Sequence, residues 1–232
     1  MKLKLTLLGL AATATLATAQ IFTTNVTGVA TAGNTIYEYN PAGMTETFTA
    51  ADLAGAITNI SISLDISGGF NGSLYAYLAG PQGQLAVLLN RPGISGSNPY
   101  GSGDAGMNIT LSETAAINIH DYAANPSSYT VTGGQVTGVG TTTFLADGRV
   151  VDPMSSGGTI GGTTPTAGLS LFNTTTGDGT WTLFIADLAP GGGNATLNSA
   201  VLTIMTAPEP QTWGMLAGGL AMLALFRRRS NF

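Results

Sequence analysis

The stretch Ile57–Ile66 reads ITNISISLDI and contains the clearest alternation of apolar and polar residues in the chain. The apolar positions are Ile60, Ile62, Leu64 and Ile66, and the polar positions between and after them are Ser61, Ser63, Asp65 and Ser67. Successive side chains of a β-strand point to opposite faces, so a period of two describes a strand with one buried and one solvated face. The stretch therefore predicts a half-buried strand.

Other segments on both sides of this stretch also read as strands. They cover residues 74–78, 85–89, 181–185 and 200–204. Turn-forming residues separate them, as in GPQG at 80–83 and PGGGN at 190–194. No long amphipathic helical window is present. One short helix is possible, around residues 50–55. We therefore predict an all-β fold of two packed antiparallel sheets.

Residues 93–162 have a weaker pattern, in which clusters of turn-forming residues surround short apolar runs. We expect strands at 107–111, 129–131 and 142–145 within this segment. The whole segment is interpreted as a long elaboration of the sandwich.

The composition excludes several classes of protein. Only 8% of the 232 residues are charged, against about 25% in an average soluble protein. A coiled coil, a helical bundle or a nucleic-acid binder would need far more charge. The chain has no cysteine, as expected of an exported protein that does not rely on disulfides.

The charges are also unevenly distributed. Between residues 20 and 206 there are two basic residues, Arg91 and Arg149, against eleven acidic ones, a net charge of −9. Such a surface repels nucleic acid and anionic lipid, and attracts divalent cations or cationic polymers. We expect no nucleic-acid partner.

The N-terminus has the three parts of a secretory signal peptide. Lys2 and Lys4 precede an apolar run at 5–14, and Ala17-Thr18-Ala19 forms an A-x-A site. We predict a signal peptide at 1–19, with cleavage between Ala19 and Gln20. The alternative is a short buried helix. A membrane span is excluded, because ten apolar residues are too few to cross a bilayer.

The C-terminal segment 207–232 combines Pro208-Glu209-Pro210, a Gly-rich apolar stretch at 213–226, and the cluster Arg227, Arg228 and Arg229. This arrangement resembles the PEP-CTERM sorting signal of Gram-negative bacteria. The resemblance implies recognition by an exosortase in the inner membrane, cleavage near Pro208–Pro210, and association with exopolysaccharide and biofilm matrix. The 14 apolar residues would hold a membrane only transiently, and an ordinary single-span anchor is the alternative.

Two blocks within residues 57–204 resemble the P domain (P/Homo B) of proprotein convertases. The first is ITNISISLDI at 57–66, followed by NGSLYAYL at 71–78 and the GPQG turn. The second is GTWTLFIAD at 179–187. The resemblance implies a jelly-roll-like antiparallel β-sandwich over the ectodomain, residues 20–206, with no chemistry of its own. Ser73 stands where the family has an aspartate.

The residues for catalysis are few. His120 is the single histidine, and its neighbour Asp121 cannot orient it as a catalytic carboxylate would, because adjacent side chains do not face each other in that way. No G-x-S-x-G motif is present. We predict that the protein is not an enzyme, with no catalytic residue and no cofactor, and that His120 is a satisfied structural residue.

Calcium is the metal that the composition allows, since it needs only oxygen ligands. The candidate ligands are Asp104, Asp121, Asp178 and Asp187, in or beside loops, and the alternative is that each caps a turn. Asp187 is the residue for which we most expect a buried, hydrogen-bonded role.

Aromatic residues could contact a glycan. Tyr75 and Tyr77 share one face of a strand. They form a ligand contact if that face is outward, and packing if it is inward, which is the interpretation we favour. Trp181 is expected in the core.

These observations predict an exported, non-catalytic protein of the cell surface or extracellular matrix. It would be processed by signal peptidase and exosortase, anchored in the inner membrane before processing, and active in adhesion or in organising exopolysaccharide and cell-surface glycans. One alternative is a calcium-dependent carbohydrate-binding module. Another is an accessory P-domain partner of a serine protease.

Overall fold

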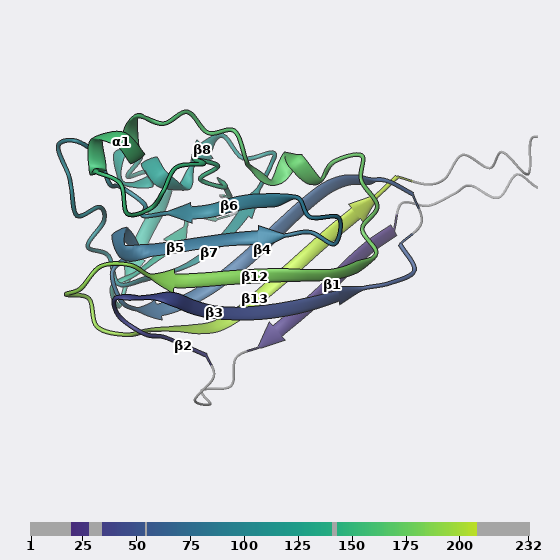
Figure 1. Cartoon of the computed structure of the whole chain (residues 1–232), viewed down its shortest axis with the longest axis horizontal. Helices are drawn as coiled ribbons and strands as arrows, with labels where there is room; N and C mark the ends of the chain where they lie inside the picture. Colours follow the sequence, from purple (N-terminus) through teal and green to yellow (C-terminus); the bar gives the residue numbers. More distant parts are fainter. Residues whose placement is uncertain (1–19, 28–33, 54, 141–142, 208–232) are drawn as a thin grey trace, which may run out of the picture. The chain divides into compact units, whose positions relative to one another are not determined.

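Two β-sheets lie face to face in the computed structural model, which describes residues 20–27, 34–53, 55–140 and 143–207 (Figure 1). The larger sheet has the order β1 (Gln20–Thr27), β13 (Ala195–Thr206), β4 (Ile57–Gly68), β7 (Gly106–Ser112), β10 (Gln135–Gly138) and β9 (Tyr129–Thr132). Three short strands also pair within it: β2 (Thr35–Ile36), β8 (Ile117–Asn118) and β11 (Phe144–Leu145). The smaller sheet has the order β3 (Asn40–Ala50), β12 (Gly179–Asp187), β5 (Leu74–Ala79) and β6 (Leu85–Asn90).

The helical elements are short. They are α1 (Gly157–Gly162) and the 3₁₀ helices η1 (Asn71–Ser73), η2 (Ile119–Ala124) and η3 (Leu169–Phe172). None of the helices in the described ranges combines the length and hydrophobicity needed to cross a membrane. The described residues 51–53 are not helical, so the short helix expected around 50–55 is not formed.

Eight strands of the described chain follow a jelly-roll path. Antiparallel pairing joins β1 to β13, β3 to β12, β4 to β7, and β5 to β6. Counted along the chain, these pairs join the first strand to the last, the second to the seventh, the third to the sixth and the fourth to the fifth. Such a nested double wrap distributes the strands over two sheets, with the β5–β6 hairpin as its innermost pair. The predicted jelly-roll β-sandwich is confirmed.

The alternation in β4 determines which of its faces lies in the core. Its four apolar side chains at 60, 62, 64 and 66 are fully buried. Leu74, Ala76 and Leu78 of β5 are fully buried as well, as are Trp181 and Leu183 of β12. Each buried leucine or isoleucine contributes about 1.5–3 kcal/mol. The core between the sheets therefore supplies the main driving force for folding.

Trp181 is a core residue, as predicted. Its indole Nε1 donates a hydrogen bond to the carbonyl oxygen of Gly177 at 2.9 Å, and its ring meets that of Phe172 edge-on at 4.8 Å between centroids. The polar end of the side chain is thus satisfied inside the protein.

The larger sheet is mixed, which the prediction of antiparallel sheets did not include. Strands β10 and β11 both run parallel to β7, and β11 also runs parallel to β8. They belong to the elaboration between β7 and β12. Strand β7, and β9 and β11 within the elaboration, lie where short apolar runs predicted them. The chain leaves the sheet after β7 and returns twice in the same direction, which produces the parallel pairs.

The same elaboration covers the outer edge of β6. Backbone amides of Asp147 and Gly148 donate to the carbonyl oxygens of Leu88 and Val87, at 3.0 and 2.9 Å. Residues 86–90 of this strand are all buried, so both of its faces are covered. A strand covered on both sides reads as a continuous apolar run, which explains the sequence LAVLL at 85–89.

Candidate functional site

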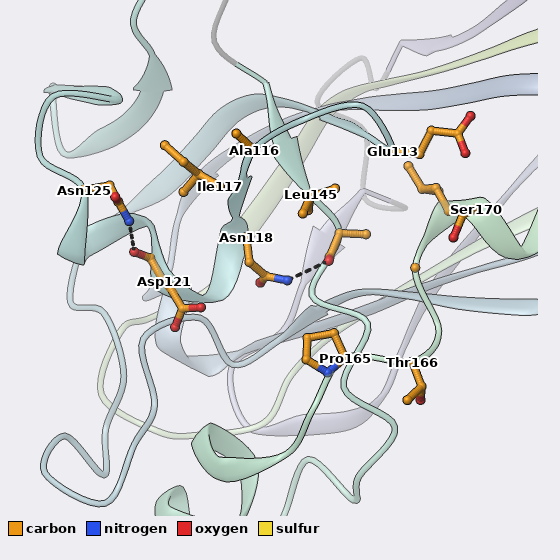
Figure 2. A pocket seen from close by; sticks show the side chains of 13 residues that line it. Glu113, Ala116, Ile117, Asn118, Asp121, Asn125, Leu145, Pro165, Thr166 and Ser170 are labelled. Atoms are coloured by element: carbon orange, nitrogen blue, oxygen red, sulfur yellow. Dashed lines mark hydrogen bonds between the residues drawn. The ribbon is translucent and has the colours of Figure 1, made fainter.

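A pocket of about 560 Å³ lies where the elaboration folds over the sandwich (Figure 2). Three segments form its walls: residues 113–125 with β8 and η2, residues 145–146 at β11, and residues 165–170 before and within η3. Six side chains present polar groups, namely Glu113, Asn118, Asp121, Asn125, Thr166 and Ser170. Apolar surface comes mainly from Ile117, Leu145 and Pro165. We call this site the polar pocket.

Two carboxylates, those of Glu113 and Asp121, give the lining of the polar pocket a negative charge. Neither Arg91 nor Arg149, nor His120, is among its lining residues. The Asp121 carboxylate is 54% exposed, and Nη2 of Arg149 lies 3.5 Å from it. The Glu113 carboxylate accepts one hydrogen bond, from Nδ2 of Asn173 at 2.5 Å. Both carboxylates therefore retain acceptor capacity for a ligand.

Asn118 is held rigidly at the inner side of the pocket. Its Nδ2 donates to the carbonyl oxygens of Ala146 and Asp147, both at 3.1 Å. Its Oδ1 accepts from the backbone amide of His120 at 2.9 Å, which caps the start of η2. Figure 2 shows the bond to Ala146. This residue joins β8, η2 and the segment after β11.

A buried charged network lies directly behind Asn118. Nδ1 of His120 lies 2.7 Å from Oδ2 of Asp147, and its Nε2 lies 2.9 Å from the carbonyl oxygen of Ile94. Oδ1 of Asp147 accepts from Nη1 of Arg149 at 3.2 Å. Both ring nitrogens of His120 therefore lie within hydrogen-bond distance of an oxygen atom. They have partners inside the protein, as expected of a satisfied residue.

Asp147 is the partner that sequence reasoning missed. It lies 27 residues from His120 in the chain and belongs to the run DGRVVDP at 147–153, which reads as a turn. No spacing pattern connects the two, because the contact depends on how the elaboration returns to β6.

The four predicted calcium ligands lie in separate hydrogen-bonding environments. Asp104 accepts from the Tyr122 hydroxyl at 2.7 Å, Asp121 lines the polar pocket, and Asp178 caps the backbone amide of Leu53 at 2.9 Å. In the described ranges, no group of three or more His, Asp or Glu side chains could hold a metal ion. The structure does not bring the predicted ligands together.

Asp187 is buried and hydrogen-bonded, as expected of it. Its Oδ1 accepts from the backbone amide of Ala189 at 3.1 Å, whereas its buried Oδ2 has no hydrogen-bond partner in the described structure. Burial raises the pKa of this carboxyl group, and the hydrogen bond from Ala189 opposes the shift.

Tyr75 and Tyr77 point away from the core, contrary to the inward packing that we favoured. Positions 74, 76 and 78 of β5 are fully buried, so the intervening tyrosines lie on the outer face and are half-buried. Phe184 of β12 stacks on Tyr77, with 4.9 Å between centroids and 14° between planes, and Tyr75 meets both rings edge-on. These rings occupy one another's faces, which leaves less aromatic surface for a glycan. Burial raises the pKa of the Tyr75 hydroxyl.

The residues of the two predicted targeting signals lie outside the described part. They are Ala17, Ala19, Pro208, Glu209, Pro210, Arg227, Arg228 and Arg229. Gln20, the predicted first residue after cleavage, begins β1.

The fold and the site define a jelly-roll β-sandwich with an acidic polar pocket formed by an elaboration between β7 and β12. No protein-family model matches the chain, and no curated protein matches it. The fold is similar to the crystal structure of the serine protease of Aeromonas sobria, solved with the chaperone ORF2 and alone. The TM-scores are 0.45 and 0.43, each at 13% identity, and 82% and 83% of this chain is covered. The match spans little more than a quarter of those chains, 27% and 28%.

Proposed function

We propose that the protein is an exported, non-catalytic module of the cell surface or extracellular matrix that binds glycan in the polar pocket. The observation that carries the proposal is the lining of that pocket. It combines two carboxylates, two amides and two hydroxyls with a few apolar side chains. Such groups pair with the alternating donors and acceptors of sugar hydroxyls, and binding sites combine apolar surface with a few placed polar groups in the same way.

The same proposal includes that the protein has no catalytic activity. The one histidine has both ring nitrogens engaged behind the pocket. General acid–base catalysis needs a group that can reach the substrate and exchange a proton with it. The P-domain resemblance, whose family performs no chemistry, agrees with the jelly-roll strand order.

The two targeting signals supply the location in this proposal. The signal peptide would export residues 20–206, and the PEP-CTERM-like segment would hold the chain at the inner membrane until exosortase releases it. The intact mass of the protein from native cells tests this. A secreted chain that starts at Gln20 and ends near Pro208–Pro210 supports it, and a chain retaining residues 213–232 in the membrane contradicts it.

Ligand binding by the pocket has its own test. Oligosaccharides released from the cells' own exopolysaccharide would be titrated into the purified protein by calorimetry. Ala116→Tyr places a bulky ring at the exposed rim of the pocket and should abolish binding. Thr130→Tyr, at an exposed position of β9 outside the pocket, adds the same ring and should leave binding unchanged. Equal binding by both variants would place the glycan site elsewhere.

A further inference from the structure

We propose that the polar pocket selects sugars that carry a free, protonated amino group, such as units of a deacetylated hexosamine polymer. This inference rests on the proposed glycan-binding function, whose sugar chemistry it specifies. Three sets of observations carry it: the charge of the whole surface, the charge of the pocket, and the way in which the two arginines are used.

The described surface favours cationic ligands over anionic ones. Residues 20–206 carry eleven acidic groups against two arginines. Arg149 is buried against Asp147, and the half-buried Arg91 donates from Nε to the carbonyl oxygen of Gly72 at 3.1 Å. Both guanidinium groups are therefore engaged by partners within the protein. A polysaccharide rich in uronic acid would be repelled, whereas a polymer of ammonium-bearing sugars would be attracted.

The lining of the pocket also favours cationic ligands. Figure 2 shows Asp121 and Asn125 at one end of the pocket and Glu113 at the other. Nδ2 of Asn125 donates to the backbone carbonyl oxygen of Asp121 at 3.0 Å, which orients this end. The Asp121 carboxylate is more than half exposed and has one long contact with Arg149. An ammonium group offers three donors and a positive charge to such a carboxylate, whereas an N-acetylated amine offers one neutral donor.

A metal ion is a weaker candidate for the same charge. Calcium takes six to eight oxygen ligands, and the described residues contain no group of three acidic or histidine side chains that could hold an ion. The two carboxylates belong to separate segments of the lining, one after β7 and one in η2. Two separated carboxylates in an open pocket suit an organic cation that also carries hydroxyl groups.

The experiment is a calorimetric comparison of three probes on the protein purified from its native cells. The probes are a glucosamine hexasaccharide, its fully N-acetylated counterpart and an oligogalacturonate of the same length. We expect the glucosamine probe to bind about tenfold more tightly than the acetylated one, because its contacts with carboxylates are charge-assisted. The preference should shrink as salt rises from about 0.05 to about 0.5 M.

Three isosteric variants connect the preference to the pocket. Asp121→Asn and Glu113→Gln should each remove most of the preference for the glucosamine probe. The glutamine at position 113 keeps an oxygen that accepts the hydrogen bond from Asn173. Asp52→Asn is the matched control, because it removes one charge at an exposed position that does not line the pocket and that asparagine tolerates at φ +62°. An equal loss in the control would show a general charge effect and overturn the proposal.

The remaining outcomes distinguish a failure of the amino-sugar selectivity from a failure of the proposed glycan binding. Equal binding of the glucosamine and acetylated probes, both abolished by Ala116→Tyr, would overturn the amino-sugar selectivity and leave glycan binding intact. Tighter binding of the oligogalacturonate would also overturn it. Binding of none of the three probes would overturn the selectivity. If the native exopolysaccharide also failed to bind, the glycan-binding function would fail with it.

Discussion

Nδ1 of His120 lies 2.7 Å from Oδ2 of Asp147, and both side chains are buried. This contact joins η2 to the segment that covers the edge of β6. Through Asn118, which caps η2 and also bonds the carbonyl of Asp147, the same contact supports the inner side of the polar pocket. The stability of the pocket therefore depends on a charged network beneath it.

Asp147→Asn should destabilise the protein strongly. The substitution leaves the buried Arg149 guanidinium without the counter-charge of Asp147, and breaking a buried ion pair in this way costs about 3–5 kcal/mol. Urea denaturation would measure the change in the free energy of unfolding. Asp178→Asn serves as the control, because the asparagine keeps an oxygen that accepts the hydrogen bond from the backbone amide of Leu53. A loss below about 1 kcal/mol for Asp147→Asn would contradict a stabilising role for the Asp147–Arg149 ion pair.

The core face of β4 should be far more sensitive than its outer face. Leu64 is fully buried, so Leu64→Ala should cost about 2–5 kcal/mol through lost burial and the cavity left behind. Ser63→Ala removes one hydrogen bond, between its hydroxyl and that of Thr110 at 2.8 Å, and should cost about 1 kcal/mol. Thermal melts of both variants would compare them. Similar costs would contradict the assignment of faces.

Gly43 allows the ring of Phe184 to lie against β3. It has φ +57°, and an added Cβ would lie 2.7 Å from Cζ of Phe184 and would also meet the carbonyl oxygen of Ile185. Gly43→Ala should therefore destabilise more than Gly83→Ala, which has φ +85° and no atom within 4 Å of the added Cβ. The expected difference is about 1–3 kcal/mol by denaturant titration. Equal effects would show that backbone conformation alone accounts for both.

Asp187→Asn should stabilise the protein at neutral pH. Burial raises the folded-state pKa of Asp187 above 3.8, so its ionised form is disfavoured in the folded protein. Its contribution to stability is then most favourable at low pH and falls as pH rises through the folded-state pKa. The amide keeps an acceptor for Ala189. Denaturation from about pH 4 to pH 7 should show a flatter profile for the variant, and a less stable variant at pH 7 would contradict the prediction.

Glu38 should have the opposite pH dependence. Its carboxylate accepts from the backbone amides of Gly191 and Gly193, and these hydrogen bonds hold its pKa below 4.5. Its stabilising contribution is therefore present above pH 4.5 and is lost as pH falls through the lowered pKa. Glu38→Gln should reduce stability at pH 7 and narrow its difference from the native protein in acid. A constant difference across this range would show that the ionised form makes no special contribution.

The strands and the jelly-roll class could be predicted because alternation along a strand is a local property. Each apolar position of β4 is two residues from the next, and no distant residue is needed to read that pattern. The orientation of β5 could not be predicted in the same way. Its two faces carry Leu74, Ala76 and Leu78 or Tyr75 and Tyr77, and both are hydrophobic enough to be buried.

The candidate site was predictable only in fragments. Asp121 was selected as a carboxylate in a loop, but Glu113 and the amides that share its pocket carry no motif. They are neighbours because the elaboration after β7 passes β8, β11 and η3 before the chain re-enters the smaller sheet. The spacing of residues in the sequence does not show where this segment passes over the sandwich.

The sequence by itself determined the all-β class, the buried face of β4 and the core position of Trp181, because burial of alternating apolar side chains depends on residues a few positions apart. Only the tertiary structure decided that Tyr75 and Tyr77 face outward, that His120 pairs with Asp147, and that acidic side chains share a pocket. Those contacts join residues far apart in the chain, and their partners are set by which sheet and which loop close over them.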